Sequence, residues 1–523
     1  MKKLLGRDRV CFWPLGFLFV LATALGIRLD VCDRTGWDGL LLCFGAALVL
    51  GPLLGEGFWW LARLLCRERK PVTLSRRRAF WLSLITLLLC WLPVVLAFYP
   101  GINGYDVHNQ ARQIHSGEYT TNHPLLHTLL MGGLMQLFGD TEGYGLYTLL
   151  QTALLALSMA YAMGCLAGMK TPRWLWILLQ IFFCIAPQHG VMAASGTKDV
   201  LFAAALLTLV MELLRLHREP ERQTKPLVWL WLLLITVLVG LLRKVAVYGV
   251  ALLALALLIF GRRRLGHKLP VCMLCAALLA FGVNAGMKAA VNAQSPGLTG
   301  EEACIPCQQL GRVVTLCDID PAEREWILQR VPQAENYVPH LADPAKQYVR
   351  FLYQPRNILS FIKLWGMEGL RHPIEYIDAF LLTSRGYWDV GDESFTTIYD
   401  YQPNEAKGVL MLRHVQDTGI EERSLLPGLK ALWKRLFADN EYKRIPLVGL
   451  LLHPAVFTWL MAFLFVCTLW KGQRRLALLF GAILAETILK CFGPCCLIRY
   501  QYDLMLIAPV LLGALPALAK EEP

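Results

Sequence analysis

Residues 124–138 read PLLHTLLMGGLMQLF, and the placement of this stretch decides the topology of the whole chain. The stretch is apolar, yet it has only 15 residues and includes His127 and Gln136. A helix needs roughly 20 residues to cross about 30 Å of hydrocarbon, so a segment of this length is typical of an interfacial or re-entrant helix. We expect it to lie along the outer boundary of the membrane without crossing it.

The basic clusters on either side of this stretch support the same placement. The strongest cluster lies between residues 67 and 78, and the positive-inside rule assigns that loop to the cytoplasm. If 124–138 does not cross, the later basic clusters are cytoplasmic too, whereas a crossing helix would turn all of them outward. The charge pattern therefore favours the interfacial helix. The later clusters are Lys170 with Arg173, Arg215 to Lys225, Arg262 to Lys268, and Lys471 to Arg475.

The composition makes the bilayer the main solvent of this chain. Of its 523 residues, 56% are hydrophobic and only 17% are charged, and the mean hydropathy is +0.46. The apolar residues come in long blocks, which indicates a polytopic membrane protein and excludes an ordinary globular enzyme. The net charge of +12 comes from clusters at the ends of these blocks, so we expect no nucleic-acid partner.

The blocks predict an all-α polytopic membrane protein with about twelve transmembrane helices and both termini in the cytoplasm. The first block lacks a convincing cleavage site, so we expect a retained helix and not a removed signal. We divide the chain into residues 1–78 (two helices), 79–287 (a transmembrane module), 288–445 (an external module) and 446–523 (C-terminal helices). The expected spans are 11–27, 39–61, 79–98, 144–169, 174–186, 200–216, 227–242, 245–260, 269–287, 447–470, 476–490 and 504–518.

The external module is expected to be mixed but mainly helical. Residues 345–370 and 372–382 have helix-like apolar spacing, and such helices either lie on the outer membrane surface or pack on each other. Cys304, Cys307 and Cys317 lie in this module. In an oxidising exterior, a disulfide among them is a better interpretation than a metal site, because a single CxxC is a weak metal signal.

The first external loop carries the strongest candidate for chemistry. Asp106 lies close to the outer boundary of the bilayer, among His108, Asn109, Gln110 and His123. A partly desolvated carboxylate in this position can accept the proton of a substrate hydroxyl or bind a divalent cation such as Mg²⁺ or Mn²⁺. A helix N-cap is the structural alternative.

A second acid follows Lys198 where another external loop enters a span. The structural alternative for Asp199 is a cap or a partner of the helix dipole. The functional hypothesis is that Asp106 and Asp199 converge on one external cavity and that Lys198 supplies charge to a phosphate.

Cations also lie at outer helix ends, where they are normally depleted. Arg243 and Lys244 form one turn, and Arg499 with Tyr500 precedes the last span. A lipid-linked phosphate or diphosphate at the outer leaflet would explain them, because guanidinium binds phosphate bidentately. Snorkelling to ordinary lipid phosphates is the alternative for either arginine singly.

Several nucleotide and hydrolase motifs are missing from the sequence. It has no phosphate-binding P-loop, no Rossmann glycine fingerprint, no HExxH zinc motif and no GxSxG elbow in the expected context. We therefore expect the energy for any bond formation to come with the substrate.

These residues together resemble the GT-C superfamily of polyprenyl-phosphate-sugar-dependent glycosyltransferases, and in particular a multi-pass bacterial group within it. The similarity covers the chain from about Ala79 onward and implies a GT-C-like bundle in which 124–138 is a juxtamembrane helix. The resemblance rests on Tyr105-Asp106, Asn109-Gln110, Asn122-His123-Pro124, Lys198-Asp199, Pro306 with Gln308-Gln309 and Arg312, and Gly386-Tyr387-Trp388.

The resemblance implies roles for individual residues. The superfamily's first-loop acid, a general base, maps onto Asp106, and its second acid, which binds metal or orients the acceptor, maps onto Asp199. Basic residues that hold the donor phosphate map onto Lys198, Arg243 or Arg499. Many members have paired acids in the first loop, whereas Val107 and His108 follow Asp106 here, which weakens the metal-dependent version.

The implied activity is an inverting hexosyl transfer on the outer face of a bacterial cell membrane. The donor is a polyprenyl-phosphate-linked sugar, and the acceptor is an envelope glycan or protein. The main alternative is a lipid-linked glycan flippase, supported by ionisable residues within or near apolar blocks. A glycan polymerase or ligase with diphosphate-linked donors and a non-catalytic scaffold are the others. The residues that favour the flippase are Glu56, His453, Glu486 and Lys490.

Overall fold

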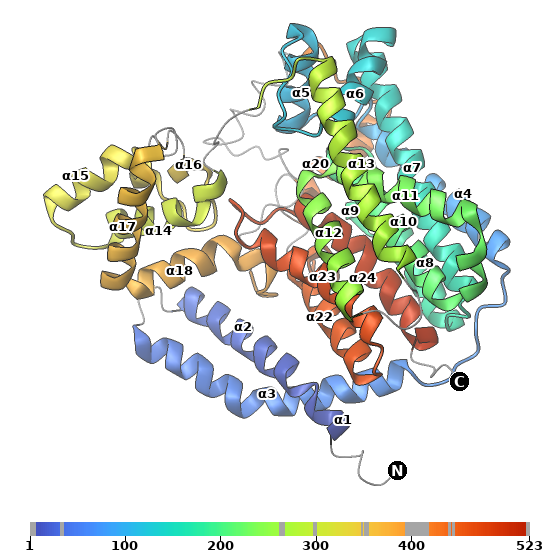
Figure 1. The fold of residues 1–523 in the computed structure, drawn as a ribbon, viewed down its shortest axis with the longest axis horizontal. Coiled ribbons are helices and arrows are strands. Elements are labelled where there is room, and N and C mark those ends of the chain that lie inside the picture. The colour runs from blue at the N-terminus through green and yellow to red at the C-terminus, as the bar shows by residue number, and fades with distance from the viewer. Residues whose placement is uncertain are drawn as a thin grey trace.

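The computed structural model describes residues 7–31, 36–260, 267–295, 301–346, 349, 355–392, 418–437, 441 and 445–518. Within these residues the chain is all-helical, and β contacts are limited to isolated bridges (Figure 1). The expected basic residues Arg262, Arg263 and Arg264 lie outside the described part. The protein is a multi-pass membrane protein, and many leucines on its surface helices are exposed, as lipid contact requires.

The N-terminal helices form a hairpin. Helix α2 (Trp13–Val31) packs along α3 (Trp37–Leu65). The backbones approach closely because glycines line the contact: a Cβ added to Gly16 would lie 2.1 Å from the carbonyl oxygen of Gly51. Small residues allow this kind of close helix packing in membranes.

A bundle of long helices forms the centre of the molecule. Helix α7 (Asp140–Gly168) packs against α4 (Arg76–Ala97) and α10 (Lys198–Arg218), and α10 packs against α24 (Ile498–Leu518). Helices α7, α10 and α24 bury most of their side chains, and α24 is covered on nearly all sides. The surrounding helices are α8 (Arg173–Ile185), α9 (Pro187–Ala193), α11 (Pro226–Leu242), α12 (Lys244–Phe260), α13 (Lys268–Ala290), α21 (Pro446–Leu452), α22 (Pro454–Trp470) and α23 (Arg474–Lys490).

The structure bears out part of the expected count of about twelve spans. Among the described residues, seven helices are long and apolar enough to cross a membrane, or up to nine if the bent pairs α8–α9 and α21–α22 each count as one span. Helices α11, α12 and α23 have 17 residues each. At about 1.5 Å per residue they fall short of a hydrocarbon layer of about 30 Å.

The ends of the helices sort into two groups that agree with the charge pattern. At the basic end, Val72 donates a backbone hydrogen bond to Thr171 at 2.9 Å, and Arg76 forms an ion pair with Glu219. At the opposite end, the backbone N–H of Ile102 donates to Ala194 at 2.8 Å. The loops predicted to be external therefore meet one another, and so do the basic loops predicted to be cytoplasmic.

Residues 124–138 form a separate short helix. Helix α6 (Leu125–Phe138) has 14 residues and is not among the helices long enough to cross. It packs against α7 and α5 (Tyr105–Ser116), and Figure 1 shows α5 and α6 together at one end of the bundle. Its length agrees with the expectation that this helix does not cross the membrane.

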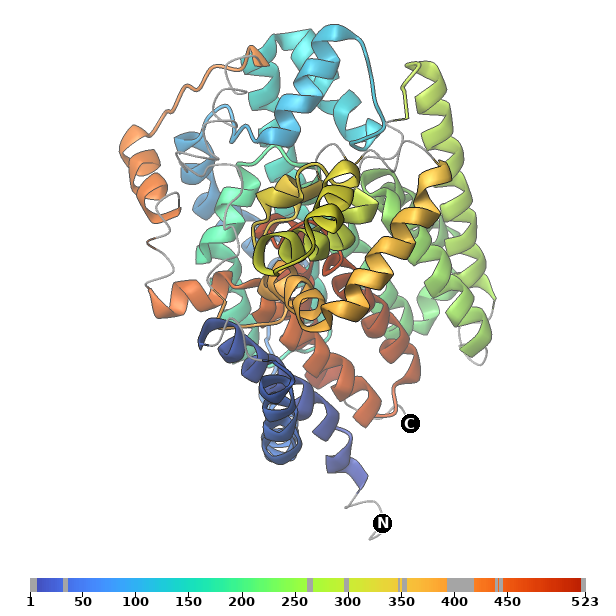
Figure 2. The same cartoon turned by 90° about the vertical axis from the view of Figure 1, so that its left-hand side faces the viewer.

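The external module lies beside the bundle, above the end of the α2–α3 hairpin at which α2 ends and α3 begins (Figures 1 and 2). Arg28 of α2 forms a buried, two-pronged pair with Asp378 at 2.6 and 3.0 Å, and Arg385 binds Asp30. These pairs fasten the module to the hairpin. Its helices include α14 (Cys304–Leu316), α15 (Pro321–Arg330), α16 (Asp343–Lys346), α17 (Pro355–Arg371) and α18 (Pro373–Ser384).

Two expectations for the module can be judged. Helix α17 packs Phe361 and Leu364 into the module and leaves Leu359 and Leu370 exposed, so packing accounts for only one of its faces. The expected disulfide is not formed, because the module's cysteines are thiols in the structure.

Candidate functional site

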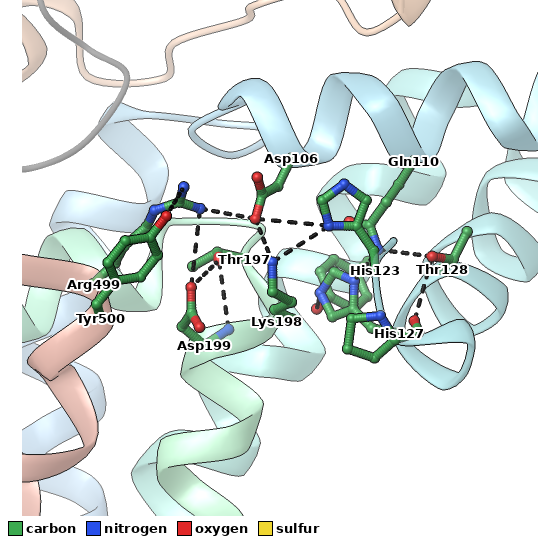
Figure 3. A network of polar contacts seen from close by, with 12 residues as sticks. Asp106, Gln110, His123, His127, Thr128, Thr197, Lys198, Asp199, Arg499 and Tyr500 are labelled. Carbon is green, nitrogen blue, oxygen red and sulfur yellow. Dashed lines mark hydrogen bonds and ion pairs between the residues drawn. The ribbon is translucent and has the colours of Figure 1, made fainter. Parts of the chain in front are cut away.

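Asp106 lies between two cations that come from distant parts of the chain (Figure 3). The Lys198 ammonium donates to Asp106 Oδ2 at 2.5 Å, and Arg499 Nη1 donates to the same oxygen at 2.9 Å. Asp106 occupies the first turn of α5, Lys198 the start of α10 and Arg499 the start of α24. The site thus forms where three helices begin, at the end of the bundle that is predicted to face outward.

Asp199 joins the same cluster from below. Arg499 Nη1 lies 3.9 Å from Asp199 Oδ2, so one guanidinium faces both carboxylates. Thr197 caps α10 and donates to Asp199 at 3.0 Å. The structure therefore brings Asp106 and Asp199 to one guanidinium, and the N-cap of α10 is Thr197.

His123 completes the cluster from the loop before α6. Its Nδ1 lies 3.4 Å from the Lys198 ammonium and 3.9 Å from Asp106 Oδ2. Burial, together with the positive charges of Lys198 and Arg499, lowers the pKa of His123 to about 4 against the pull of Asp106. His123 is therefore neutral at pH 7.

The charge state of Asp106 follows from the same contacts. Burial raises the pKa of a carboxyl group, but here the attraction of Arg499 and Lys198 prevails and holds the pKa of Asp106 well below 3.8. Two carboxylates and two cations then balance, with Asp106 only 8% exposed. The resting site is a buried neutral network, and Asp106 is a poor base in this state.

A chain of buried hydrogen bonds joins the two loops that carry the site. Gln110, one turn after Asp106, donates to His127 Nδ1 at 2.8 Å. His127 Nε2 then lies 2.6 Å from the Tyr147 hydroxyl, which donates to Gln151 at 2.9 Å. Gln151 in turn donates to the carbonyl of Ser195 at 2.5 Å. Because Gln110 is a donor at one end, this order is consistent with a neutral His127 that carries its proton on Nε2.

The loop before Lys198 packs closely against α7. A Cβ on Gly196 would lie 2.2 Å from the Tyr144 hydroxyl, so only glycine fits there. Tyr144 donates to the carbonyl of Ile102 at 2.7 Å, and Thr152 donates to that of Ala193 at 2.9 Å. Helix α7 therefore fixes both external loops, which sets Lys198 against Asp106.

The other predicted residues of the first loop have different surroundings. His108 is buried and its Nε2 lies 2.7 Å from Arg112 of the same helix. Asn109 is half-buried, and none of its side-chain hydrogen bonds is seen among the described residues. Tyr500 places its ring 5.0 Å from the Arg499 guanidinium, which it helps to hold. Gln110 can position the site, because it begins the chain of buried hydrogen bonds through His127.

Arg243 lies in a neighbouring cluster. Its Nη1 is 3.3 Å from Glu486 and 3.7 Å from Asp503, and its guanidinium lies 5.0 Å from the ring of Phe202. Phe202 follows Asp199 by one turn of α10, so this cluster adjoins that of Asp106.

Arg312, predicted as a substrate-binding residue, lies in a different cluster from Asp106. It is 1% exposed, donates to Glu375 at 2.5 Å and lies 3.8 Å from Asp378. These partners belong to α18, and Asp378 also binds Arg28. Arg312 therefore contributes to the core of the external module and to its attachment, and the structure does not bring it to Asp106.

The donor set does not fit the expected metal ion. Among the described residues, no group of three His, Cys, Asp or Glu side chains is placed to hold a metal. The Asp106 oxygen that would bind a cation is already contacted by Lys198 and Arg499. We derive no step through Mg²⁺ or Mn²⁺.

Residues of the buried chain were missed as site residues. His127, Tyr147, Gln151 and Ser195 lie in or between apolar segments. A polar side chain in such a segment must find a partner, because an unsatisfied group is costly in hydrocarbon. The glutamine within 144–169 was a usable signal.

Chemically, the cluster is suited to an anion that can displace a carboxylate. Lys198 and the N-terminus of α10 favour negative charge, and Arg499 can bind two oxygens of one phosphate. The side chain of Lys198 is 22% exposed, so this cation is partly reachable, whereas Arg499 is buried.

A family model matches residues 114–515, which include His123, Lys198, Asp199, Arg243 and Arg499. The match carries no assignment to the GT-C superfamily. No curated protein and no solved structure matches the chain. Because the family model covers more than half of the sequence, the chain belongs to DUF6020, a family of unknown function.

Proposed function

We propose that this protein is a GT-C-like membrane glycosyltransferase that moves a hexose from a polyprenyl-phosphate-linked donor to an envelope glycan or protein on the outer face of a bacterial cell membrane. The observation that carries the proposal is the position of Asp106, held between Lys198 and Arg499 at the outer helix ends. A carboxylate beside two phosphate-binding cations is what transfer from a lipid phosphate requires.

The donor phosphate takes the place of carboxylate oxygens on Lys198 and Arg499. The start of α10 adds N–H groups that stabilise an anion, and Arg499 faces both acids, so it can release one and keep the other. The isoprenoid chain stays among the exposed apolar residues of the surrounding helices. The headgroup then sits at the membrane boundary beside Asp106.

Donor binding also changes Asp106 into a base. Once the phosphate has drawn the two cations, their attraction for Asp106 falls and the phosphate adds a repelling negative charge. Burial, which raises the pKa of a carboxyl group, then dominates. Asp106 becomes able to accept a proton near neutral pH only when a donor is present.

The reaction is a single displacement. The acceptor hydroxyl oxygen forms a bond to the sugar's anomeric carbon, and the bond from that carbon to the phosphate oxygen breaks. The hydroxyl proton goes to Asp106. The lipid phosphate leaves with the bonding electron pair, and Lys198 and Arg499 stabilise its negative charge. Attack opposite the leaving group inverts the anomeric centre.

The test is reconstitution of the purified protein in liposomes with a panel of hexoses linked to polyprenyl phosphate or polyprenyl diphosphate. Release of the free lipid phosphate or diphosphate that depends on added envelope glycan or protein acceptors supports the transferase. No release with any donor, in protein that is folded by its thermal transition, contradicts it.

A flippase is the second candidate, because of the charges among the helices at Arg243. Lys490 pairs with Glu486 and Asp503 there, and transporters place such ionisable groups along a substrate path. The same liposomes distinguish the two functions. Movement of intact sugar lipid between leaflets without release of lipid phosphate favours the flippase.

A further inference from the structure

A second group of charges lies one helical turn beyond the Asp106 cluster. Asp503 follows Arg499 by about one turn of α24, and Lys490 donates to both Asp503 oxygens at 2.8 and 3.0 Å. The same ammonium lies 2.8 Å from Glu486. One turn is about 5.4 Å long, so the two clusters adjoin along α24.

Arg243 is the member of this group whose hydrogen-bonding capacity is unused. Lys490 already binds both carboxylates, and Arg243 approaches them only to 3.3 and 3.7 Å. In the described part of the chain, its guanidinium makes ion pairs but no hydrogen bond, although its side chain is only 25% exposed. A guanidinium has five N–H donors, so this side chain is prepared for an acceptor with several oxygens.

Lys244 adds a second cation at the same turn. It is exposed, and no acid contacts it among the residues that the structure describes. The Arg243 guanidinium lies 5.0 Å from the ring of Phe202, which follows Asp199 by about one turn of α10, so Arg243 and Lys244 adjoin the cluster of Lys198 and Arg499.

Snorkelling does not explain Arg243. A snorkelling arginine turns its head outward toward lipid headgroups. The contacts of Arg243 are with Glu486, Asp503 and Phe202 inside the bundle.

We propose that Arg243 and Lys244 form a second anion-binding site, here called the second seat, beside a first seat formed by Lys198 and Arg499. The donor headgroup would then carry two adjacent phosphates, one for each seat. This inference rests on the proposed function and narrows its donor to a diphosphate-linked sugar. A headgroup with a single phosphate can occupy only one of the two seats at a time. Two phosphates joined through one oxygen are the most compact pair of anionic groups that can contact both, and each guanidinium can bind its phosphate bidentately.

The experiment measures binding of two sugar-free probes, polyprenyl phosphate and polyprenyl diphosphate, to the full-length protein in phosphatidylcholine nanodiscs. We expect the diphosphate to bind at least about tenfold more tightly. Arg243→Gln and Lys244→Gln each weaken diphosphate binding about tenfold, equivalent to about 1.4 kcal/mol, and leave monophosphate binding within about twofold. Arg324→Gln, which removes an exposed cation of the external module, changes neither.

The outcomes separate this inference from the function on which it rests. Equal affinity for the two probes, or equal weakening of both by Arg243→Gln, overturns the second seat. If the second seat is overturned in this way but monophosphate binding still depends on Lys198, the transferase proposal survives. If neither probe binds the folded wild type, both proposals fail. Lys244→Gln keeps the test decisive if Arg243→Gln does not fold, because Lys244 is exposed.

Discussion

Asp106 and Arg499 form a buried pair whose members are 393 residues apart in the sequence. Both are 8% exposed, so removing one partner leaves the other charged and poorly solvated. We predict that Asp106→Asn and Arg499→Gln each lower the unfolding free energy by about 3 kcal/mol. The double variant should lose clearly less than the sum, by at least about 1 kcal/mol, in denaturant unfolding in detergent.

The matched control is a surface pair. Arg423 binds Glu142 at 2.6 Å with both side chains more than half exposed. Exposed pairs contribute about 0 to 1 kcal/mol, so the corresponding cycle should show little coupling. Additive losses at Asp106 and Arg499 would contradict the buried pair.

His123 predicts a pH dependence of stability. Its pKa is about 4 in the folded protein and 6.5 otherwise, so the unfolded state binds the proton first as the pH falls. Stability is then lost between about pH 6.5 and 4, by up to about 3 kcal/mol from this group, and the loss stops below pH 4. The thermal midpoint of His123→Gln should fall less steeply over this range than that of the wild type. Parallel curves would show that His123 is not buried beside the cations.

The sequence predicted most of the charged residues of the site but not which of them contact one another. Asp106, Lys198, Asp199, His123 and Arg499 stood out because charged or polar residues at the outer ends of apolar blocks need a reason. That one guanidinium faces both acids depends on how α10 and α24 pack, which no local pattern contains. For the same reason Arg312, a charged residue in a polar module, could not be told from a ligand-binding arginine.

At the scale of the elements, α7 supports the site through its buried polar face. Tyr147→Phe removes one hydroxyl and leaves the N–H of His127 and the oxygen of Gln151 without their partner. Each unsatisfied buried group costs about 1 to 3 kcal/mol. We predict a lower thermal midpoint and faster amide hydrogen exchange at residues 195–199.

Tyr248→Phe on α12 is the control, because Tyr248 is 58% exposed. Unchanged exchange at residues 195–199 in Tyr147→Phe would mean that the hydrogen-bond chain does not hold the Lys198 loop.

Helix existence was easier to predict than helix length. Each of the twelve expected apolar blocks contains a helix, since a continuous apolar run has no other stable state in hydrocarbon. Pro187 and Pro454 each begin a new helix after a bend, and α11, α12 and α23 end at 17 residues. Hydropathy measures apolar character and not the position of a bend, so it could not predict which blocks form one long helix and which form a bent pair or a short helix.

For the whole molecule, the two groups of helix ends predict opposite sides of the membrane. Chains truncated after residue 170 and fused to green fluorescent protein should fluoresce, because Lys170 belongs to the basic end. Chains truncated after residue 295 and fused to alkaline phosphatase should be active, because Gln294, which follows α13, exchanges backbone hydrogen bonds with Tyr119 and Thr121 of the loop predicted to be external. The reverse pattern at both positions would place the site in the cytoplasm.

The most direct measurement is the rate at which purified protein in liposomes releases polyprenyl lipid from a labelled polyprenyl-linked hexose, compared between wild type and Asp106→Asn. Proton removal by a positioned base contributes about a hundredfold or more. We predict that the folded variant binds the donor but releases lipid at least about a hundredfold more slowly. Equal rates in the two proteins would contradict a catalytic Asp106.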